Sequence, residues 1–333
     1  MLAAYYSTRG AAREVLEVGE LPTPTPDEGE VLVRIGASGT NPSDVKTRNG
    51  NMGPMTVDRC VPHCDGAGVI EAVGEGISDR RVGERVWLYN VNRTDDGLGQ
   101  SAIGTAAQYV ALDADLAVPL TNGVSLVEGA CLGVPAMTAH RALFADGGIE
   151  GQSILITGGA GAVGAMAIQM ATAAGARVIT TVSGDTKAEA ALADGADAVV
   201  NYKTEPLVEA VLEANRGQKL DRVVDVDFGT HINLTTDLLK PNGIVAAYAS
   251  MGSPQPSLNY YPLMFNNTLM RLVFVYAMPF DAQIEAQLDI DEMLRAGAIS
   301  PRVASTHPLS DIVAAHEEVE AGQQIGNVVL EIS

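Results

Sequence analysis

Ser153-Ile-Leu-Ile-Thr-Gly-Gly-Ala-Gly-Ala-Val-Gly164 is the stretch of this 333-residue chain that decides its fold. Its first five residues predict a buried strand, and Gly159-x-Gly161-x-x-Gly164 then turns into an Ala-rich helix that starts at Ala162 and Val163. The first glycine permits a tight turn, the second lets backbone approach a pyrophosphate, and the third lets the helix pack closely on the strand. The N–H groups and the positive dipole end of the helix favour phosphate there. Because a strand precedes the motif and a helix follows it, the stretch predicts dinucleotide binding.

Composition excludes several other classes of protein. Apolar residues make up 47 % of the chain without an uninterrupted membrane-length run, so we expect no transmembrane helix. The net charge of −20, from 41 acidic and 21 basic residues, opposes binding to nucleic acid and to anionic membranes. Three cysteines and the absence of a signal-peptide pattern predict a cytoplasmic protein without a disulfide framework.

The strand pattern changes once along the chain. Between Val31 and Val118, short alternating runs broken by glycines predict a barrel-like β unit, with strands at 31–35, 68–73, 85–89 and 107–111. After Asn122, strands alternate with helices, which predicts a parallel doubly wound sheet. Its strands are expected at 153–157, 177–182, 198–200, 222–226, 243–248 and 272–274.

The segments before and after the doubly wound sheet complete the predicted organisation. Residues 125–144 predict a helix broken near Pro135, and further helices are expected at 279–295 and from Ser310. A last strand at 327–332 could return to the N-terminal β unit. We therefore expect one domain from residues 1–122 with 276–333, and a dinucleotide-binding domain from residues 123–275.

Separated motifs give the chain a family resemblance over its whole length. The motifs are Asn41-Pro-Ser-Asp44, Asp65-Gly-Ala-Gly68 with Val73-Gly74, Gly83-Glu-Arg-Val86, Gly104-Thr-Ala-Ala-Gln-Tyr109, Val134-Pro-Ala-Met-Thr-Ala139, the glycine loop, Ala315-His-Glu317 and Gly326-Asn-Val-Val-Leu330. The chain resembles the zinc-free quinone oxidoreductase (zeta-crystallin-like) branch of the medium-chain dehydrogenase/reductase superfamily. This resemblance implies an α/β protein with a GroES-like β-barrel catalytic domain and a Rossmann domain, commonly assembled as a homodimer.

A zinc site needs separate consideration, because Cys60, His63, Cys64 and Asp65 lie close in the sequence. Catalytic zinc takes three protein ligands, mostly Cys and His. The resemblance places the three ligand positions of zinc-dependent relatives at Asn41, Cys64 and Val134, of which only Cys64 could bind zinc. We therefore expect no metal, and we interpret the cysteines as small buried hydrophobic residues.

The residues after the second and third strands of the doubly wound sheet bear on the choice of dinucleotide. NAD-specific sites place Asp or Glu about 20 residues beyond the glycine loop, on the ribose 2′-OH. Here the second strand ends at Ser183, Lys187 follows one helical turn later, and Tyr202 ends the third strand. This set is similar to the NADPH-binding pattern of quinone oxidoreductases. The alternative is that Asp185 selects NAD, although we expect it to be the N-cap of the following helix.

The resemblance also implies the remaining site residues. Asn41 and Asp44 are expected to position the substrate and the nicotinamide, although either could simply serve a turn or cap a helix. The other residues that the resemblance places near the cofactor are Thr138, Phe228, Ser250, Met251, Phe274, Val275 and Asn327. The five histidines are scattered, and no residue stands out as a general acid.

The predicted reaction is hydride transfer from NADPH to a quinone, with a proton from solvent or a ribose hydroxyl. Several relatives carry tyrosines where this chain has Lys46 and Met52, which leaves room for an enone or enoyl-thioester acceptor. A non-catalytic NADPH-binding protein is a further alternative. A zinc alcohol dehydrogenase is disfavoured by the residues at the ligand positions.

Overall fold

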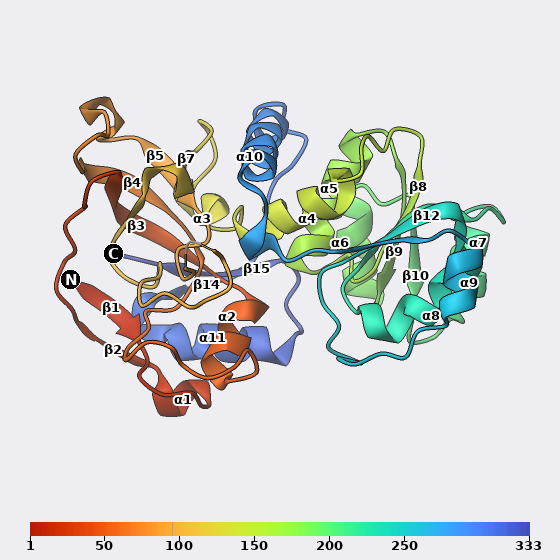
Figure 1. The fold of residues 1–333 in the computed structure, drawn as a ribbon, viewed down its shortest axis with the longest axis horizontal. Helices are drawn as coiled ribbons and strands as arrows, with labels where there is room; N and C mark the ends of the chain where they lie inside the picture. The colour runs from red at the N-terminus through yellow and green to blue at the C-terminus, as the bar shows by residue number, and fades with distance from the viewer. Residues whose placement is uncertain (95) are drawn as a thin grey trace. The chain divides into compact units, whose positions relative to one another are not determined.

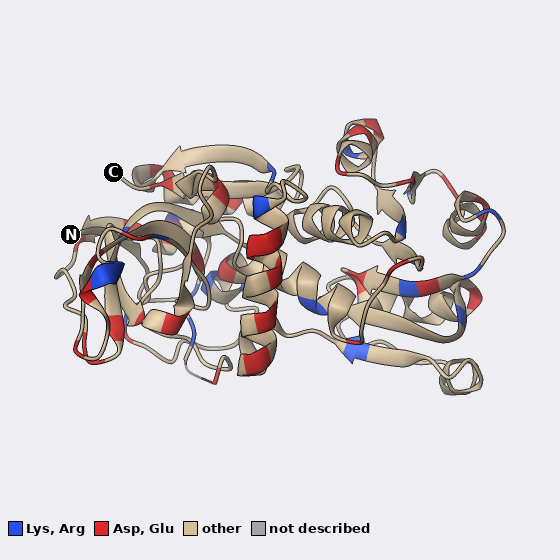
Figure 2. Cartoon of the chain, turned by 90° about the horizontal axis from the view of Figure 1, so that it is seen from above, with Lys and Arg blue, Asp and Glu red and all other residues tan. Residues whose placement is uncertain are grey.

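The computed structural model describes residues 1–94 and 96–333. The chain divides into two compact units. Unit 1 contains Met1–Pro135 and Ser300–Ser333, and unit 2 contains Ala136–Ile299 (Figure 1). Acidic residues are distributed through both units, including successive turns of the helix α10 (Phe280–Arg295), as Figure 2 shows. No helix in the described chain combines the length and the apolar character needed to cross a membrane.

Unit 2 is built on a six-stranded parallel sheet in the order β10-β9-β8-β11-β12-β13. The chain order reverses between β8 and β11, which is the switch point where doubly wound sheets bind ligands. The strands are β8 (Ser153–Ile156), β9 (Arg177–Val182), β10 (Ala198–Asn201), β11 (Leu220–Asp225), β12 (Leu239–Ala247) and β13 (Leu269–Leu272). The first five predicted strands and the predicted fold class are confirmed. The sixth strand is expected at 272–274, but β13 covers Leu269–Leu272 and ends where the predicted strand begins.

Helices connect these strands and cover their apolar side chains. They are α5 (Ala162–Ala173), α6 (Asp185–Ala193), α7 (Leu207–Ala214), α8 (Phe228–Leu238) and α9 (Tyr260–Phe265), and α4 (Val134–Phe144) precedes the first strand. Val211 of α7 and Ile232 of α8 are fully buried against Leu155, Val223 and Val245 of the sheet. This packing fixes the sheet whose carboxyl edge carries the glycine loop.

Unit 1 contains a mostly antiparallel sheet in the order β14-β15-β3-β4-β5-β7, with β6 also paired to β3. Its strands are β3 (Glu30–Thr40), β4 (Asp65–Val73), β5 (Arg85–Leu88), β6 (Tyr109–Asp113), β7 (Ala117–Pro119), β14 (Val303–Pro308) and β15 (Asn327–Glu331). A small sheet pairs β1 (Leu2–Tyr5) with β2 (Glu17–Glu20), and the helices are α1 (Ala12–Val15), α2 (Pro42–Asn49), α3 (Leu126–Gly129) and α11 (Ile312–Ala321). Because β15 pairs with β3, the predicted return of the last strand to the N-terminal unit is confirmed.

The compact units have other bounds than the predicted domains. The segment 123–135 belongs to unit 1, because α3 packs on β3 and β4. The helix α10 belongs to unit 2, where Asp289 accepts a hydrogen bond from His140 of α4 at 2.8 Å. The predicted helix break also lies earlier than Pro135. Residues 130–133 separate α3 from α4, and Pro135 lies in the first turn of α4, where its missing N–H costs no hydrogen bond.

A buried chain of hydrogen bonds crosses unit 1. The Thr105 hydroxyl donates to the Asp65 carbonyl at 2.5 Å, so Ser38 donates to Thr105 at 2.7 Å and His63 Nδ1 donates to Ser38 at 2.8 Å. His63 Nε2 then accepts from His316 Nε2 at 2.9 Å. His316 Nδ1 is left as an unprotonated nitrogen without a hydrogen-bond partner among the described residues. The direction of every proton follows because a carbonyl oxygen can only accept.

These two histidines predict a loss of stability in acid. Burial lowers the pKa of His63 to about 3, and burial with the charges of His63 and Arg48 lowers the pKa of His316 well below its usual value. Below about pH 6.5 both histidines bind protons in the unfolded chain but stay neutral in the folded chain. The free energy of unfolding therefore falls by up to about 1.4 kcal/mol per pH unit for each histidine.

Urea unfolding between pH 7.5 and 5 measures this effect. The raised pKa of Asp44, about 6, acts in the opposite direction, because its protonation stabilises the fold as the pH falls through that value. The comparison of wild type with His316→Gln isolates the histidine, and the variant should lose less stability on acidification. Equal losses would contradict the prediction.

Candidate functional site

The glycine loop has an open surface at one glycine, a close side-chain contact at another and a close backbone contact at the third. A Cβ on Gly159 would lie 2.0 Å from Thr180 Oγ1, and a Cβ on Gly164 would lie 2.3 Å from the Gly158 carbonyl oxygen. At Gly161 the nearest atom would be 3.4 Å away. The first and third glycines are therefore required by the protein itself, while the second leaves room for a ligand at the backbone.

The helix that follows begins without a side-chain cap. Gly161 is the N-cap of α5, so Ala162 and Val163 form the first turn, and no side chain accepts a hydrogen bond there. Gly161 is exposed and the two helical residues are half-buried. Donors left unsatisfied at a helix start are the groups that bind a pyrophosphate, so the residues fit a dinucleotide.

Ser183 and Tyr202 follow neighbouring strands, β9 and β10. The Tyr202 N–H donates to the Val182 carbonyl at 3.2 Å, which brings both predicted residues to the same edge of the sheet. Tyr202 is 51 % exposed, and its ring is free to contact a ligand. Lys187 lies in the first turn of α6, half-buried, without an ion-pair partner among the residues the structure describes.

The expected role of Asp185 as an N-cap is wrong by one residue. Gly184 occupies the N-cap position of α6, and Asp185 is the first helical residue. Its carboxylate still lies in the first turn, where negative charge is favourable to the helix dipole. Stabilisation of the helix start is therefore a structural role for Asp185 that does not require contact with the ribose of a cofactor.

The switch point holds a polar cluster that the sequence did not reveal. The buried carboxylate oxygen Asp225 Oδ1 accepts hydrogen bonds from the Thr157 hydroxyl at 2.8 Å, from the Asp227 N–H at 2.9 Å and from His231 Nδ1 at 2.8 Å. Burial alone would lower the pKa of His231, but the hydrogen bond and the charge of Asp225 outweigh it, so that pKa is raised. Only the polar residue at each strand end, Thr157 and Asp225, could have signalled the cluster.

The other residues expected near the cofactor in unit 2 differ in availability. Ser250 Oγ accepts from the Gly229 N–H at 2.9 Å and donates to the Ser253 carbonyl at 2.7 Å, so it holds the loop after β12 in place. Met251 and Phe274 are exposed, whereas Val275 and Thr138 are buried. Phe228 begins α8, and its N–H donates to Ala249 at 2.9 Å.

Asn41 and Asp44 lie together at the start of α2 in unit 1. The Asn41 N–H donates to Asp44 Oδ2 at 2.8 Å, which is the helix-capping contact expected as the plain alternative. Asn41 Nδ2 donates to Asp65 Oδ2 at 2.7 Å. Because a carboxylate can only accept, the amide oxygen of Asn41 must point away from Asp65. Asn41 is thus oriented as an acceptor by a buried carboxylate that the sequence interpretation did not assign to the site.

Asp65 is held tightly and carries an unsatisfied oxygen. Its Oδ2 also accepts from the Val134 N–H at 2.8 Å, and its Oδ1 has no hydrogen-bond partner in the part of the chain that the structure describes. A Cβ on Gly133 would lie 2.1 Å from that oxygen. Burial and the charge of Asp44 raise the pKa of Asp65 well above its usual value, and burial raises the pKa of Asp44 to about 6.

Asn327 has an internal role in unit 1. Its N–H and its side-chain amide both donate to the Arg302 carbonyl, at 2.8 and 2.9 Å. These two bonds lock the start of β15 against the strand before it. The expected cofactor contact of Asn327 stays a prediction.

The residue types of unit 1 do not form a metal-binding group in the described chain. No cluster of three or more His, Cys, Asp or Glu side chains suited to a metal is present among the described residues. Cys64 is buried, burial raises the pKa of its thiol well above the usual value, and Val134 offers only backbone. Zinc takes Cys, His and carboxylate side chains, so Val134 cannot supply a side-chain ligand.

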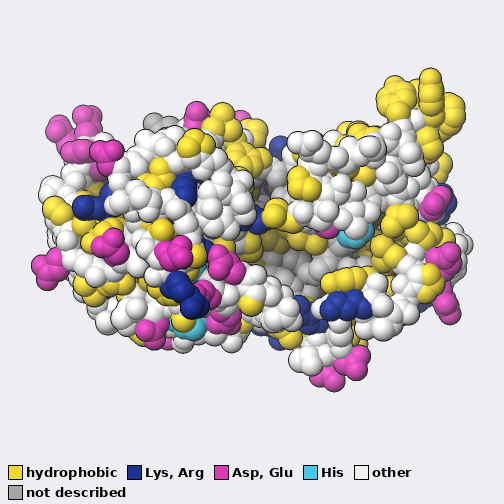
Figure 3. Space-filling view, turned by 90° about the horizontal axis from the view of Figure 1, so that it is seen from below, with side chains coloured by type: hydrophobic (Ala, Val, Ile, Leu, Met, Phe, Trp, Pro, Cys, Tyr) yellow, Lys and Arg dark blue, Asp and Glu magenta, His cyan; other side chains and the backbone are white. Residues whose placement is uncertain are grey.

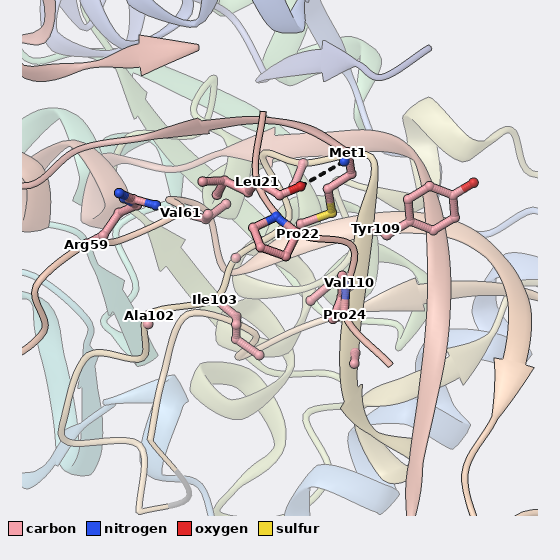
Figure 4. A pocket seen from close by; sticks show the side chains of 13 residues that line it. Met1, Leu21, Pro22, Pro24, Arg59, Val61, Ala102, Ile103, Tyr109 and Val110 are labelled. Atoms are coloured by element: carbon pink, nitrogen blue, oxygen red, sulfur yellow. Dashed lines mark hydrogen bonds between the residues drawn. The ribbon is translucent and has the colours of Figure 1, made fainter. Parts of the chain in front are cut away.

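Unit 1 also has an apolar hollow of about 240 Å³, shown in Figure 4. Met1, Leu21, Pro22, Val61 and Ile103 contribute to its wall. None of the predicted site residues lines it. The hollow is therefore separate from the polar cluster around Asn41.

The comparisons with known proteins agree with this geometry. Residues 27–122 match the alcohol dehydrogenase GroES-like domain, and residues 162–293 match the zinc-binding dehydrogenase family. Human quinone oxidoreductase is 27 % identical over 316 residues, which cover 93 % of this chain and 91 % of the relative.

Two solved structures extend the likeness to the whole chain. The Escherichia coli quinone oxidoreductase complexed with NADPH has a TM-score of 0.87 at 27 % identity and covers 99 % of this chain and 100 % of its own. An NAD-dependent alcohol dehydrogenase has a TM-score of 0.88 at 27 % identity, with 100 % of both chains covered. Together with the matched domains, these relatives show that the chain belongs to the zeta-crystallin-like quinone oxidoreductase branch of the medium-chain dehydrogenase/reductase superfamily.

Proposed function

We propose that this chain is an NADPH-dependent, zinc-independent oxidoreductase that reduces a quinone in the cytoplasm. The observation that carries the proposal is the open turn at Gly161 before an uncapped helix, beside Ser183, Lys187 and Tyr202. Quinone oxidoreductases among the relatives, one of them solved with NADPH, support the reaction class. The three free, buried cysteines support a reducing location.

The choice of NADPH depends on local charge. A 2′-phosphate needs a cation, and Lys187 is an ammonium group without an ion-pair partner in the described chain. Ser183 is small enough to leave space and has a hydroxyl that can donate. Asp185, the residue that would favour NAD, lies at the helix start, where the dipole already stabilises its charge.

The two units contribute different functions to the proposed reaction. Bound NADPH supplies the hydride, and the glycine loop holds its pyrophosphate. Asn41, oriented by Asp65, presents an amide oxygen as a hydrogen-bond acceptor, and Asp44 holds the Asn41 backbone. The described residues offer no cysteine–histidine set for zinc, so substrate activation is assigned to positioning and hydrogen bonding.

Replacement of Lys187 tests the cofactor proposal. Lys187→Ala should weaken NADPH binding by about 10-fold or more, the effect expected for one hydrogen bond to a charged group, and leave NADH nearly unchanged. Dissociation constants from fluorescence titration measure both. Lys203→Ala, an exposed lysine beside Tyr202, is the matched control. Equal weakening of both cofactors would show that Lys187 does not contact the 2′-phosphate. A wild type that binds NADH more tightly than NADPH, with this preference lost in Asp185→Asn, would assign the site to NAD.

The acceptor is tested by steady-state NADPH oxidation with 1,4-benzoquinone, a simple enone and an acryloyl thioester. We expect the quinone to be reduced, with activity insensitive to a chelator and with substoichiometric zinc in the purified protein. Turnover of the enone or thioester alone would favour an alkene reductase of the same fold. Tight NADPH binding without oxidation of any acceptor would identify a non-catalytic binding protein.

A homodimer is the second part of the proposal, and an apolar face on unit 2 supports it. Tyr260, Tyr261 and Phe265 of α9 are 65, 64 and 77 % exposed, and Leu272 of the neighbouring strand β13 is 72 % exposed. Figure 3 shows the apolar side chains of α9 projecting from the surface. In the sheet order β13 is an edge strand, so its outer backbone groups are available for pairing. A second copy related by a two-fold axis can pair the same edge with itself and cover both faces.

Light scattering after size-exclusion chromatography tests the dimer. The wild type should have twice the mass of one chain, and Phe265→Glu should shift the mass toward the monomer, because a buried unpaired charge opposes association. Leu192→Glu changes an equally apolar, 51 % exposed residue of α6 and should leave the mass unchanged. A monomeric wild type would contradict the proposal.

A further inference from the structure

A second hollow, on unit 2, is lined by two arginines. Its volume is about 170 Å³, and Arg141 of α4 and Arg271 of β13 face it. The rest of the lining is apolar or backbone, from Leu272 to Phe274 and from Ala277 to Pro279. No acidic residue lines it. A cavity with two guanidinium groups and no carboxylate of its own has the composition of an anion site.

The two arginines differ in how far their donors are used. Arg271 donates from Nε and Nη2 to Asp146, and its Nη1 has no hydrogen-bond partner among the described residues. Arg141 is half-buried and has neither an ion pair nor a hydrogen-bond partner among the described residues. One guanidinium group is therefore oriented by a carboxylate behind it, and the other has all its donors available.

The local charge is positive although the chain as a whole is strongly acidic. Asp146 also accepts from Arg222, at 3.4 Å, so one carboxylate serves two arginines. Arg141 adds a further positive charge at the hollow. In a chain of net charge −20, an excess of cations around one half-enclosed space has to be explained. A bound anion would compensate it.

The shape and the apolar wall narrow the class of anion. The volume is below the 300–1,000 Å³ typical of drug-sized ligands, so the hollow suits a small molecule. Phe274, Met278 and Pro279 offer an apolar surface beside the arginines. A compact carboxylic acid with an apolar body satisfies both parts, because a carboxylate pairs with guanidinium groups and the body covers the wall.

The position in the sheet separates this hollow from the dinucleotide phosphates. The glycine loop follows β8, and Ser183 and Tyr202 follow β9 and β10, on one side of the switch point. Arg271 lies in β13, which is three strands from β8. At about 4.8 Å per strand this separation is roughly 14 Å. The pyrophosphate and the 2′-phosphate do not need these arginines.

We propose that Arg141 and Arg271 form a binding site for the carboxylate of a small organic acid with an apolar body. The site is independent of the dinucleotide phosphates. Arg271, held in place by Asp146, provides its Nη1 group, and Arg141 provides the second cation. The proposal does not require that the protein reduces a quinone, since it concerns binding alone.

Calorimetric titration of the full chain with benzoate tests the site. Benzoate should bind, and benzamide, which has the same shape without the charge, should bind at least about 10-fold more weakly. Arg141→Gln should weaken benzoate by about 10-fold or more. Arg34→Gln, which changes a 55 % exposed arginine of unit 1 paired with Glu71, should leave the affinity unchanged. Equal affinity for benzoate and benzamide, or no effect of Arg141→Gln, would overturn the proposal.

Two further arms identify other occupants of the arginine pair. Saturating 2′-phospho-ADP-ribose, which carries the phosphates of NADPH without the nicotinamide near which Phe274 is expected, should leave benzoate binding intact. Displacement of benzoate would assign the arginines to the dinucleotide phosphates. The mass of Arg141→Gln in solution should equal that of the wild type. If benzoate fails to bind and the variant changes its oligomeric state, the carboxylate belongs to a second copy of the chain, and the small-acid site is wrong.

Discussion

The lack of side chains where β8 meets α5 is the constraint on which unit 2 depends. Gly159 lies against Thr180 of the next strand, and Gly164 lies against the Gly158 carbonyl, at distances that no Cβ could occupy. This close approach turns the chain directly from the strand into the helix. It thereby places the helix start, with its uncapped N–H groups, at the switch point between β8 and β11. The proposed phosphate site and the tight turn depend on the same absence of side chains.

In unit 1, buried polar side chains and not their absence determine the local structure around Asn41, Asp44 and Asp65. There the side chains are present, buried and polar, and hydrogen bonds must compensate the loss of water. Asp65 accepts from Asn41 and from the backbone of Val134, and its carbonyl ends the chain of bonds that runs back to His316. One residue therefore orients the acceptor amide of Asn41 and anchors the buried histidine pair. A substitution at Asp65 would act directly on Asn41 alone, because the bond from Thr105 uses the backbone carbonyl of Asp65.

Much of this arrangement could be predicted from the sequence because it is local. The strand, the three glycines and the helix are adjacent, and Ser183 and Tyr202 end neighbouring strands in a regular alternation. The Asp225–His231 pair and the arginine pair could not be predicted in this way. Arg141 and Arg271 are 130 positions apart, and only the packing of α4 near the edge strand brings them to one hollow. The contact of Asn327 could not be predicted either. Nothing in the sequence around it indicated that its side-chain amide would donate to the Arg302 carbonyl.

The net charge of the chain affects both proposed anion sites of unit 2. With a net charge of −20, the field of the whole chain repels any anion, so each anionic ligand needs local donors that outweigh it. Unit 2 provides them at two separate places: the helix start with Lys187 on one side of the sheet, and Arg141 with Arg271 at the other edge. The acidic background then improves selectivity, because an anion that cannot reach either set of donors gains nothing from the surface.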